Sequence, residues 1–397
     1  MRRVYLDHSA TTPVHPLVAE EVHKYLTGDN FGNPSSIHYY GQIACRALDQ
    51  ARDRVAGAIG AVAEEITFTS GGTEASNMAI HGAALTNRKR GGHIITCAVE
   101  HPATLHSVQA LAEFGFHITI LPVDRYGMVR IEELVAAITD ETILISIMHA
   151  NNEIGTIMPI TEISRLIKER GNILFHVDAV QSFGKIPVNV SELGVDLLSV
   201  SGHKIYGPKG VGALYVRKGA GWRPTLFHGG AQERLRRAGT ENLPGIAGFG
   251  VAAELAVNNM ESDAKQQTAL RDRLIKEIPE MFSHVRLTGH PEQRLPNHAS
   301  FIFEFIEGES MLLSLDMKGI AASTGSACSS GSLAPSHMLL AMGIPHELAQ
   351  GSLRLSLGRS NNAEDIDYFL ETMAPIVARL RAMAPIKEQG DYEKYLP

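Results

Sequence analysis

Two stretches decide the fold: Ile173-Leu174-Phe175-His176-Val177-Asp178 and Val195-Asp196-Leu197-Leu198-Ser199-Val200, the second followed directly by Ser201-Gly202-His203-Lys204. Each is a short, mostly apolar run with β-branched residues, which is typical of a buried strand. One run ends in an acid and the other leads into an amine. Because the carboxyl ends of neighbouring parallel strands face the ligand crevice of an α/β sheet, we expect Asp178 and Lys204 to lie close together.

Runs of the same kind alternate with helical patterns on both sides of these two strands. Short apolar runs lie at 66–69, 93–99, 118–123, 143–147 and 212–216, and helical spacing lies at 72–85, 103–114, 131–138 and 160–170. Strands that are apolar throughout, with helices between them, predict a mostly parallel sheet that is covered by helices on both faces. The expected fold class is therefore α/β.

The pattern changes near residue 247. A long helical pattern covers 246–280, and short apolar runs at 285–287 and 298–305 and a helical stretch at 310–318 follow it. We expect a large domain of residues 1–258 and a smaller α+β domain of residues 259–397 at the carboxyl end. The first ~15 residues are expected to pack with the small domain.

Composition and charge exclude several classes of protein. The chain of 397 residues is 44% hydrophobic with a net charge of −7, which favours a soluble globular protein and argues against a broad nucleic-acid surface. No apolar run approaches the roughly 20 residues of a membrane helix, and no signal-peptide core follows Met1. The three cysteines, Cys45, Cys97 and Cys328, are widely spaced, and no histidines pair with carboxylates in a metal motif. We therefore expect no disulfide framework, no metal site and a cytoplasmic location.

The combination of Lys204, Asp178 and a phosphate loop indicates pyridoxal 5'-phosphate (PLP). A lysine amine forms a Schiff base with the PLP aldehyde, and a carboxylate keeps the pyridine nitrogen protonated. Ser70-Gly71-Gly72-Thr73 lies between a strand and a helix start, where small residues let backbone N–H groups reach a phosphate. Taken alone, the loop is equally an ordinary turn and Lys204 a surface lysine. The loop matches neither the ATP-binding nor the dinucleotide-binding glycine pattern.

Three further positions carry two interpretations each. His101 follows a strand and could stack on a planar cofactor, or it could only cap the next helix. Asn151 and Asn152 could bind a cofactor oxygen or a substrate carboxylate, or they could supply turn geometry. Arg354 lies among alternating apolar residues and is either a solvated edge-strand residue or a clamp for a carboxylate.

Cys328 lies in a segment of almost wholly small and polar residues, 323–332. That composition predicts a mobile loop with an accessible thiol, because no apolar neighbour is at hand to pack against the sulfur. A reactive thiol is favoured over an inert packing residue. Cys45 and Cys97 lie in apolar surroundings and are expected in the core.

These segments together resemble the group I cysteine desulfurases of the NifS/IscS type, a branch of the fold-type I PLP enzymes. The resemblance runs from residues 5–12 to residues 356–359 and so covers nearly the whole chain. Its specific motifs are Gly71-Gly72-Thr73-Glu74, Glu100-His101, Asn151-Asn152-Glu153-Ile154-Gly155, His176-Val177-Asp178-Ala179 with Gln181, Ser201-Gly202-His203-Lys204, Arg237-Ala238-Gly239-Thr240 and the Cys328 segment.

The resemblance implies a PLP site and a role for each of its residues. Lys204 would hold PLP and act as the base that moves protons. Asp178 would pair with the pyridine nitrogen, Gln181 with the ring oxygen, and His101 would stack on the ring. The residues expected at the phosphate are Gly72, Thr73, Ser201 and His203, together with Thr240 acting in the partner subunit of a homodimer.

The resemblance also implies the substrate and the reaction. Asn152 and Arg354 would hold the carboxylate of L-cysteine, and Lys204 would remove its Cα proton. The Cys328 thiolate would then attack the substrate sulfur, leaving L-alanine and a persulfide on Cys328. The sulfur would serve iron–sulfur cluster assembly or other acceptors through an acceptor or scaffold protein, with no need for nucleic acid or membrane.

Rival functions are another PLP enzyme, such as an aminotransferase or a selenocysteine lyase, and a non-catalytic sulfur relay. An aminotransferase would have no use for the Cys328 segment. Selenocysteine and cysteine differ little in shape, so the residues do not separate a lyase from a desulfurase. A silent relay need not keep Lys204, Asp178, His101 and Arg354 together with that cysteine.

Overall fold

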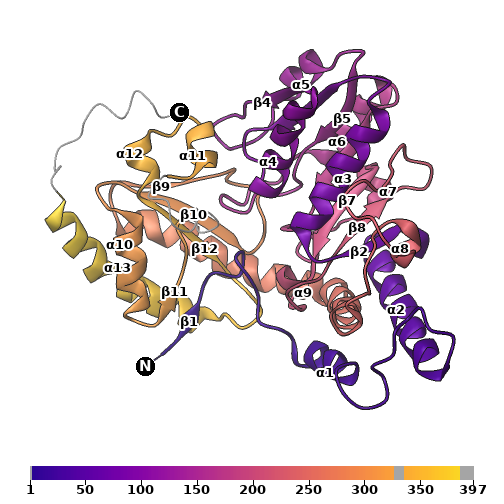
Figure 1. Ribbon diagram of the computed structural model, residues 1–397. Coiled ribbons are helices and arrows are strands. Elements are labelled where there is room, and N and C mark those ends of the chain that lie inside the picture. Colours follow the sequence, from indigo (N-terminus) through magenta and orange to yellow (C-terminus); the bar gives the residue numbers. More distant parts are fainter. Residues whose placement is uncertain (1, 326–334, 385–397) are drawn as a thin grey trace.

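The computed structural model describes residues 2–325 and 335–384 and contains a central seven-stranded sheet in the order β2-β8-β7-β6-β5-β3-β4 (Figure 1). The pairings β7–β6, β6–β5, β5–β3 and β3–β4 are parallel, whereas β8 runs antiparallel to both of its neighbours. In sheet order the strands are β2 (Ile66–Thr69), β8 (Gly212–Val216), β7 (Leu197–Ser201), β6 (Leu174–Asp178), β5 (Thr142–Ser146), β3 (His93–Cys97) and β4 (His117–Leu121). The expected α/β class with a mostly parallel sheet is confirmed.

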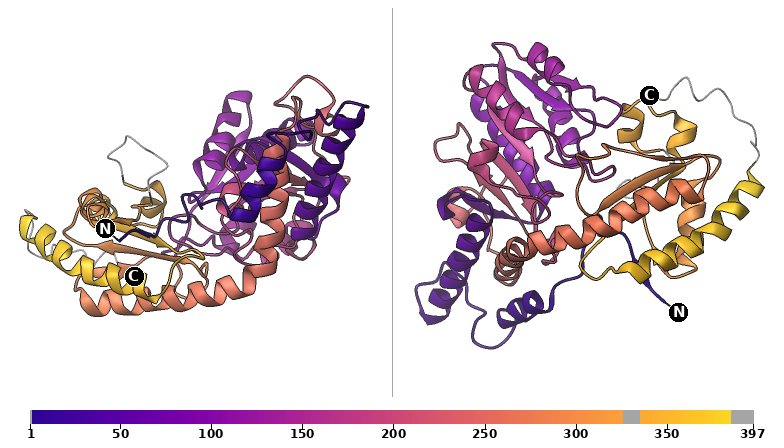
Figure 2. Two further views of the ribbon diagram at one scale, coloured as in Figure 1. Left: turned by 90° about the horizontal axis from the view of Figure 1, so that it is seen from below. Right: turned by 180° about the vertical axis from the view of Figure 1, so that it is seen from behind.

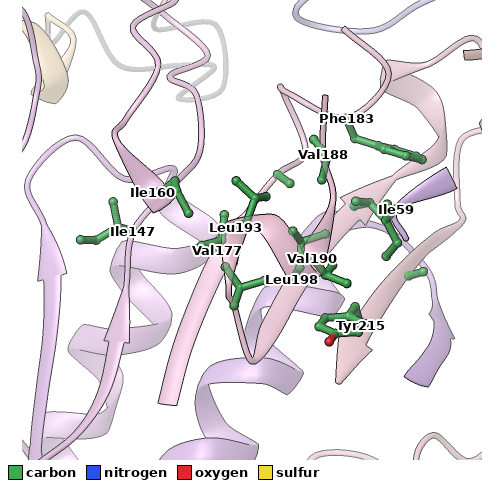
Figure 3. Close-up of a cluster of buried hydrophobic side chains, with 14 of the residues drawn as sticks. Ile59, Ile147, Ile160, Val177, Phe183, Val188, Val190, Leu193, Leu198 and Tyr215 are labelled. Atoms are coloured by element: carbon green, nitrogen blue, oxygen red, sulfur yellow. The ribbon is translucent and has the colours of Figure 1, made fainter. Parts of the chain in front are cut away.

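Helices cover both faces of this sheet. Successive side chains of each strand point to opposite faces, and the strands are apolar on both, so each face packs against helices. Leu197 packs in a cluster with α3 and α4, whereas Leu198 packs in the cluster on the other face. Figure 3 shows Leu198 beside Val177 and Tyr215 of the sheet and Val190 and Leu193 of α7. The helices of this part of the chain are α1 (Pro16–Lys24), α2 (Tyr39–Ala58), α3 (Gly72–Asn87), α4 (Pro102–Ala110), α5 (Ile131–Ala137), α6 (Ile160–Glu169), α7 (Val190–Leu193) and α8 (Gln232–Leu235).

A second, antiparallel sheet lies beside the first in the order β12-β10-β9, with its own apolar core. Near it, β1 of the amino-terminal segment pairs in parallel with β11. The strands are β9 (Val285–Leu287), β10 (His298–Phe303), β12 (Ser352–Ser356), β1 (Val4–Tyr5) and β11 (Ile320–Ala321), and the helices are α10 (Gly308–Asp316), α11 (His337–Ala341), α12 (His346–Ala349) and α13 (Ala363–Met383).

The long helix α9 (Leu243–Met281) connects the two sheets. Its first part packs against α1 and α2, and its last part lies against the core of the small sheet, as Figure 2 shows. The boundary that we propose between residues 258 and 259 therefore falls within a continuous helix. None of the helices described is both long and apolar enough to span a bilayer.

Candidate active site

Lys204 and Asp178 come from neighbouring strands, as expected. β6 ends at Asp178 and pairs in parallel with β7, and a short 3-10 turn carries the chain from β7 to Lys204. The Asp178 carboxyl is buried, and the Val180 N–H donates to its Oδ1 at 2.9 Å. Burial raises the pKa of Asp178 to about 6, while that hydrogen bond and the positive charge of Lys204 act in the opposite direction.

The Lys204 amine contacts the amino-terminal strap, by which we mean residues 7–12. Its Nζ donates to the carbonyl of Ala10 at 2.8 Å and also to the carbonyl of Ser9. Gln181 Nε2 donates to the same Ser9 carbonyl at 2.9 Å. The strap thus brings the predicted PLP lysine and the predicted partner of the ring oxygen to one peptide group.

The predicted phosphate residues gather at the amino end of α3. A Cβ atom added to Gly72 would lie 2.7 Å from Val180 Cγ2 and 3.7 Å from Ser201 Cβ, so the backbone here approaches its neighbours as only glycine allows. Thr73 is exposed in the first turn of the same helix. The Ser201 hydroxyl is buried, and no described residue hydrogen-bonds to it. An anion at the start of α3 would supply that hydroxyl with a partner.

Two histidines near Lys204 are neutral at pH 7. Burial, with the charge of Lys204 as the next cause, lowers the pKa of both His101 and His203 to about 4. His203 Nδ1 lies 3.2 Å from the Thr11 hydroxyl. His101 Nδ1 accepts from the Ala103 N–H at 3.1 Å and caps α4, so the ring proton of neutral His101 lies on Nε2. The capping role is therefore present, and stacking on a cofactor stays a proposal.

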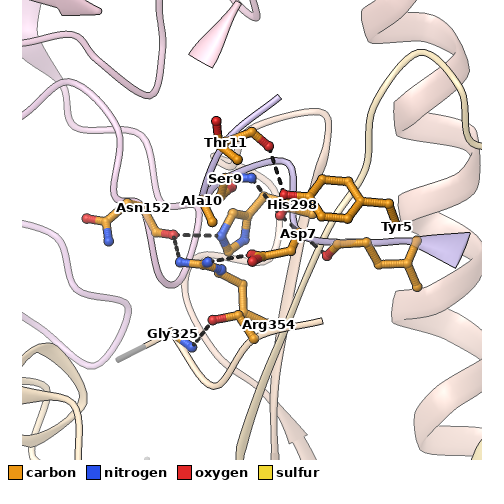
Figure 4. Close-up of polar contacts among 12 residues, drawn as sticks. Tyr5, Asp7, Ser9, Ala10, Thr11, Asn152, His298, Gly325 and Arg354 are labelled. Carbon is orange, nitrogen blue, oxygen red and sulfur yellow. Dashed lines mark hydrogen bonds and ion pairs between the residues drawn. The ribbon is translucent and has the colours of Figure 1, made fainter. Parts of the chain in front are cut away.

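Arg354 lies on an edge strand, β12, yet it is buried and not solvated. Its Nη2 lies 2.7 Å from Asp7 Oδ1, and its Nη1 donates to the Asn152 carbonyl at 3.0 Å, as Figure 4 shows. Arg354 Nε and Asn152 Oδ1 are both buried without a hydrogen-bond partner among the described residues. Buried polar atoms of this kind are nearly always satisfied, so the pair fits a bound polar group.

The Asn151 side chain supplies turn geometry and does not face Arg354 as Asn152 does. Its Oδ1 accepts the N–H groups of Glu153 and Ile154, and its Nδ2 donates to the Val99 carbonyl at 3.0 Å. This side chain shapes the turn after β5 and directs Asn152 towards Arg354.

Two predicted residues are not brought to this site by the described chain. Thr240 is exposed on the loop between α8 and α9, where it lines a hollow of about 150 Å³ together with Ser70. Cys328 lies outside the described residues. The residues that flank it are held at the site, because Ser323 and Arg354 exchange backbone hydrogen bonds and the Ser336 hydroxyl donates to Glu153.

Sequence reasoning assigned no role to the strap or to Lys185. Asp7 of the strap pairs with Arg354, and the carbonyls of Ser9 and Ala10 accept from Lys204. Lys185 Nζ donates to Gln181 Oε1 at 3.0 Å. A polar run, Asp7-His8-Ser9-Ala10-Thr11-Thr12, next to a β-type start was the available signal for the strap.

The residues present fit PLP. The buried carboxyl of Asp178, the amine of Lys204 and the unpartnered Ser201 hydroxyl beside the start of α3 correspond to the pyridine nitrogen, the aldehyde and the phosphate. Across residues 2–325 and 335–384, no three histidine, cysteine or acidic side chains are grouped as a metal site.

The family model for class-V aminotransferases matches residues 4–369. The chain belongs to the class-V aminotransferase family. It is 56% identical over 385 residues to the cysteine desulfurase IscS of Methanosarcina thermophila, an alignment that covers 97% of this chain and 94% of that protein. The resemblance to the NifS/IscS type is therefore confirmed, and with it the dependence of this class-V enzyme on PLP.

Solved structures agree with this membership of the class-V family. A NifS-like protein superposes with a TM-score of 0.89 at 40% identity, covering 95% of this chain and 100% of that one. A structure of SspA in complex with cysteine superposes with a TM-score of 0.78 at 37% identity, covering 89% of this chain and 99% of that one.

Proposed function

We propose that this chain converts L-cysteine to L-alanine with PLP and receives the substrate sulfur on Cys328. The observation that carries the proposal is the convergence of Lys204 and Arg354 on the strap, with Asp178 at the end of the neighbouring strand, in a chain whose relatives are cysteine desulfurases. Bound PLP supplies an electron sink that makes the Cα proton of the substrate acidic. Selenocysteine lyase and aminotransferase activities are not favoured by these relatives.

Asp178 and Lys204 would work as a pair of opposite charge. The ionised carboxylate of Asp178 would hold the pyridine nitrogen in its protonated form. Lys204 would take the Cα proton on its amine and return a proton at the end of the reaction. His101 is neutral and would stack on the ring with Nε2–H directed away from the cap of α4.

The substrate carboxylate would bind between Arg354 and Asn152. Arg354 has a buried Nε–H that no described residue accepts, and Nη1 and Nη2 are held by Asn152 and Asp7. A carboxylate oxygen at Nε would give that N–H a charge-assisted hydrogen bond in addition to the pairing of Nη2 with Asp7. This would fix the Cα proton of the substrate towards Lys204.

Cys328 would act as the sulfur acceptor. Its thiolate would form an S–S bond with the substrate sulfur while the substrate C–S bond breaks, and the carbon fragment would leave as alanine after it takes up protons. The residues on either side of the cysteine segment support this role. Ser323 is hydrogen-bonded to Arg354 and Ser336 to Glu153, so the chain enters and leaves that segment at the substrate site.

We further infer a cytoplasmic homodimer that passes sulfur to an acceptor or iron–sulfur scaffold protein. Large apolar side chains are exposed on and around α1, α2 and α8, which supports the binding of a second copy on that side of the molecule. These side chains are Leu26, Phe31, Ile37, Tyr39 and Leu235. The exposed Thr240 lies on the adjoining loop and would complete the phosphate site of the partner.

The test is to incubate the purified protein with L-cysteine and a reductant and to measure alanine and sulfide together. Equal amounts of both products are expected from the wild type. Cys328→Ala should keep the cofactor absorbance and yet release neither product. Normal turnover by that variant, or alanine without sulfide, would contradict the proposal.

A further inference from the structure

Lys185 is a second amine close to Lys204 that the proposed reaction does not use. It lies in the turn after β6, seven residues beyond Asp178 in the chain. The charged and titratable groups around the two amines are Arg354, His8, His203 and His298 near Lys185, and Asp178, His101 and His203 near Lys204. Burial lowers the pKa of Lys185 to about 7, and the charges of Lys204 and Arg354 add to this effect.

The Lys185 amine and the Ser9 carbonyl fix the orientation of the Gln181 side chain. Lys185 Nζ donates to Gln181 Oε1 at 3.0 Å, and Gln181 Nε2 donates to the Ser9 carbonyl at 2.9 Å. A carbonyl oxygen can only accept, and a protonated lysine amine can only donate. Rotating the amide by half a turn would set its oxygen against the Ser9 carbonyl oxygen at any pH. Below the pKa of Lys185, which is about 7, it would also set N–H against N–H, so both neighbours then select the same orientation.

This orientation decides what Gln181 can offer to a cofactor. The side chain is buried, and its Nε2 has two hydrogens, of which the Ser9 carbonyl takes one. The second hydrogen can be given to an ionised ring oxygen, whereas the amide oxygen would repel such an oxygen. Lys204 binds the same Ser9 carbonyl, so Lys185 and Lys204 lie at opposite ends of one hydrogen-bonded chain.

We propose that Lys185 is a positioning residue that fixes the Gln181 amide with its N–H groups towards the ring oxygen of PLP. The inference rests on the proposed function, because it takes the cofactor to lie between Gln181 and Lys204. Lys185 itself does not contact the reacting atoms in this account. It acts through Gln181, so its loss should change the electronic state of the bound cofactor more than it changes the fold.

The measurement is the pH midpoint at which the visible absorbance of the bound cofactor changes. A donor at the ring oxygen withdraws charge from it and weakens its hold on the neighbouring proton, so losing the donor should raise the midpoint. Loss of one hydrogen bond to a charged group corresponds to about one to two pH units. Lys185→Met and Gln181→Ala should each raise the midpoint by about that amount, and the exposed Lys218→Met is the matched control.

A double-mutant cycle distinguishes positioning from a plain effect of charge. Lys185→Met combined with Gln181→Ala should shift the midpoint no further than Gln181→Ala alone, because Lys185 has nothing left to orient. Gln181→Glu keeps an oxygen for Lys185 but has no N–H and adds a negative charge, so it should raise the midpoint at least as far as Gln181→Ala does. This variant also tests the idea if Lys185→Met fails to fold.

Three results would overturn the inference. The first is a Lys185→Met protein whose midpoint equals that of the wild type. The second is a double variant whose shift equals the sum of the shifts of the two single variants. The third is a Gln181→Glu protein whose midpoint equals that of the wild type. Failure of the proposed function would look different, because the wild-type protein itself would then lack a pH-dependent cofactor band or form no alanine from cysteine.

Discussion

At the scale of single residues, the charge of Asp178 should control how tightly the protein holds PLP. The pKa of the carboxyl is about 6, so above that pH it is ionised and would pair with the protonated ring nitrogen, and below that pH it takes up a proton. If only the ionised form binds well, the affinity due to Asp178 falls about tenfold per pH unit below 6. Titration of the apoenzyme with PLP measures this, with Asp178→Asn as the reference that removes all other pH effects.

The affinity ratio of wild type to Asp178→Asn should be large at pH 8 and approach one in acid. The sign follows from the raised pKa, since the carboxylate is present only above it. A ratio that stays constant between these conditions would show that Asp178 does not pair with the cofactor.

Arg354 should determine substrate affinity more than turnover. Lysine keeps the charge but loses the planar fork that reaches Asp7, Asn152 and a carboxylate together. Arg354→Lys should therefore raise KM for cysteine about 10- to 100-fold, the loss of one to two hydrogen bonds to a charged group, with a smaller change in kcat. Steady-state kinetics measures both constants.

Arg286→Lys is the matched control, because Arg286 lies on the edge strand β9 of the same sheet and pairs with Glu304 at 2.7 Å. It should leave KM unchanged. An equal fall of kcat and kcat/KM in Arg354→Lys, at constant KM, would remove Arg354 from the substrate site.

At the scale of elements, the packing of α9 on α2 depends on glycine. A Cβ on Gly250 would lie 2.8 Å from Ala51 Cα, a backbone atom that cannot move aside. Gly250→Ala should therefore lower the free energy of unfolding by about 1 to 3 kcal/mol, the usual cost of overpacking a core. Gly57→Ala meets no atom within 4 Å in α2 and should stabilise by up to about 1 kcal/mol. Denaturant midpoints that fail to move in opposite directions would contradict this packing.

The sheet elements could be predicted from the sequence because each strand is a local pattern. The run at 212–216 became β8 with the same bounds, and the helical pattern at 246–280 became most of α9. The contacts that the strap makes could not be predicted in this way. Asp7 meets Arg354 across 347 residues and Ser9 meets Gln181 across 172, so these contacts exist only after both sheets have packed.

The same reason explains which site residues the sequence could identify. Asp178 and Lys204 are predictable because they end neighbouring buried strands. The sequence leaves open whether Arg354 is solvated or buried, because the burial of an edge strand depends on what covers it. Here the strap covers it through Asp7. Lys185 has no motif of its own, and its partner Gln181 becomes evident only from the hydrogen bonds.

At the scale of the whole molecule, the assignment of Thr240 to the partner site predicts complementation between two inactive variants. In a dimer of Thr240→Ala and Lys204→Ala subunits, one site has Lys204 from its own subunit and Thr240 from the other. That mixed dimer, isolated with two affinity tags, should capture PLP at one site with wild-type affinity. Either homodimer alone should not, and failure of the mixed dimer to exceed both would place Thr240 in the site of its own chain.

The central claim is that sulfur from cysteine reaches Cys328 on an enzyme that holds PLP at Lys204. The most direct measurement mixes the protein with sulfur-labelled L-cysteine in the absence of reductant and maps the label on peptides by mass spectrometry. The account predicts one labelled sulfur on Cys328 and none on the buried Cys97 or on Cys45. Cys45 is half-buried and not in the core as expected, and its thiol pKa is raised by partial burial and by Asp49. Label on either of those cysteines in place of Cys328, or alanine formed with no label on the protein, would contradict it.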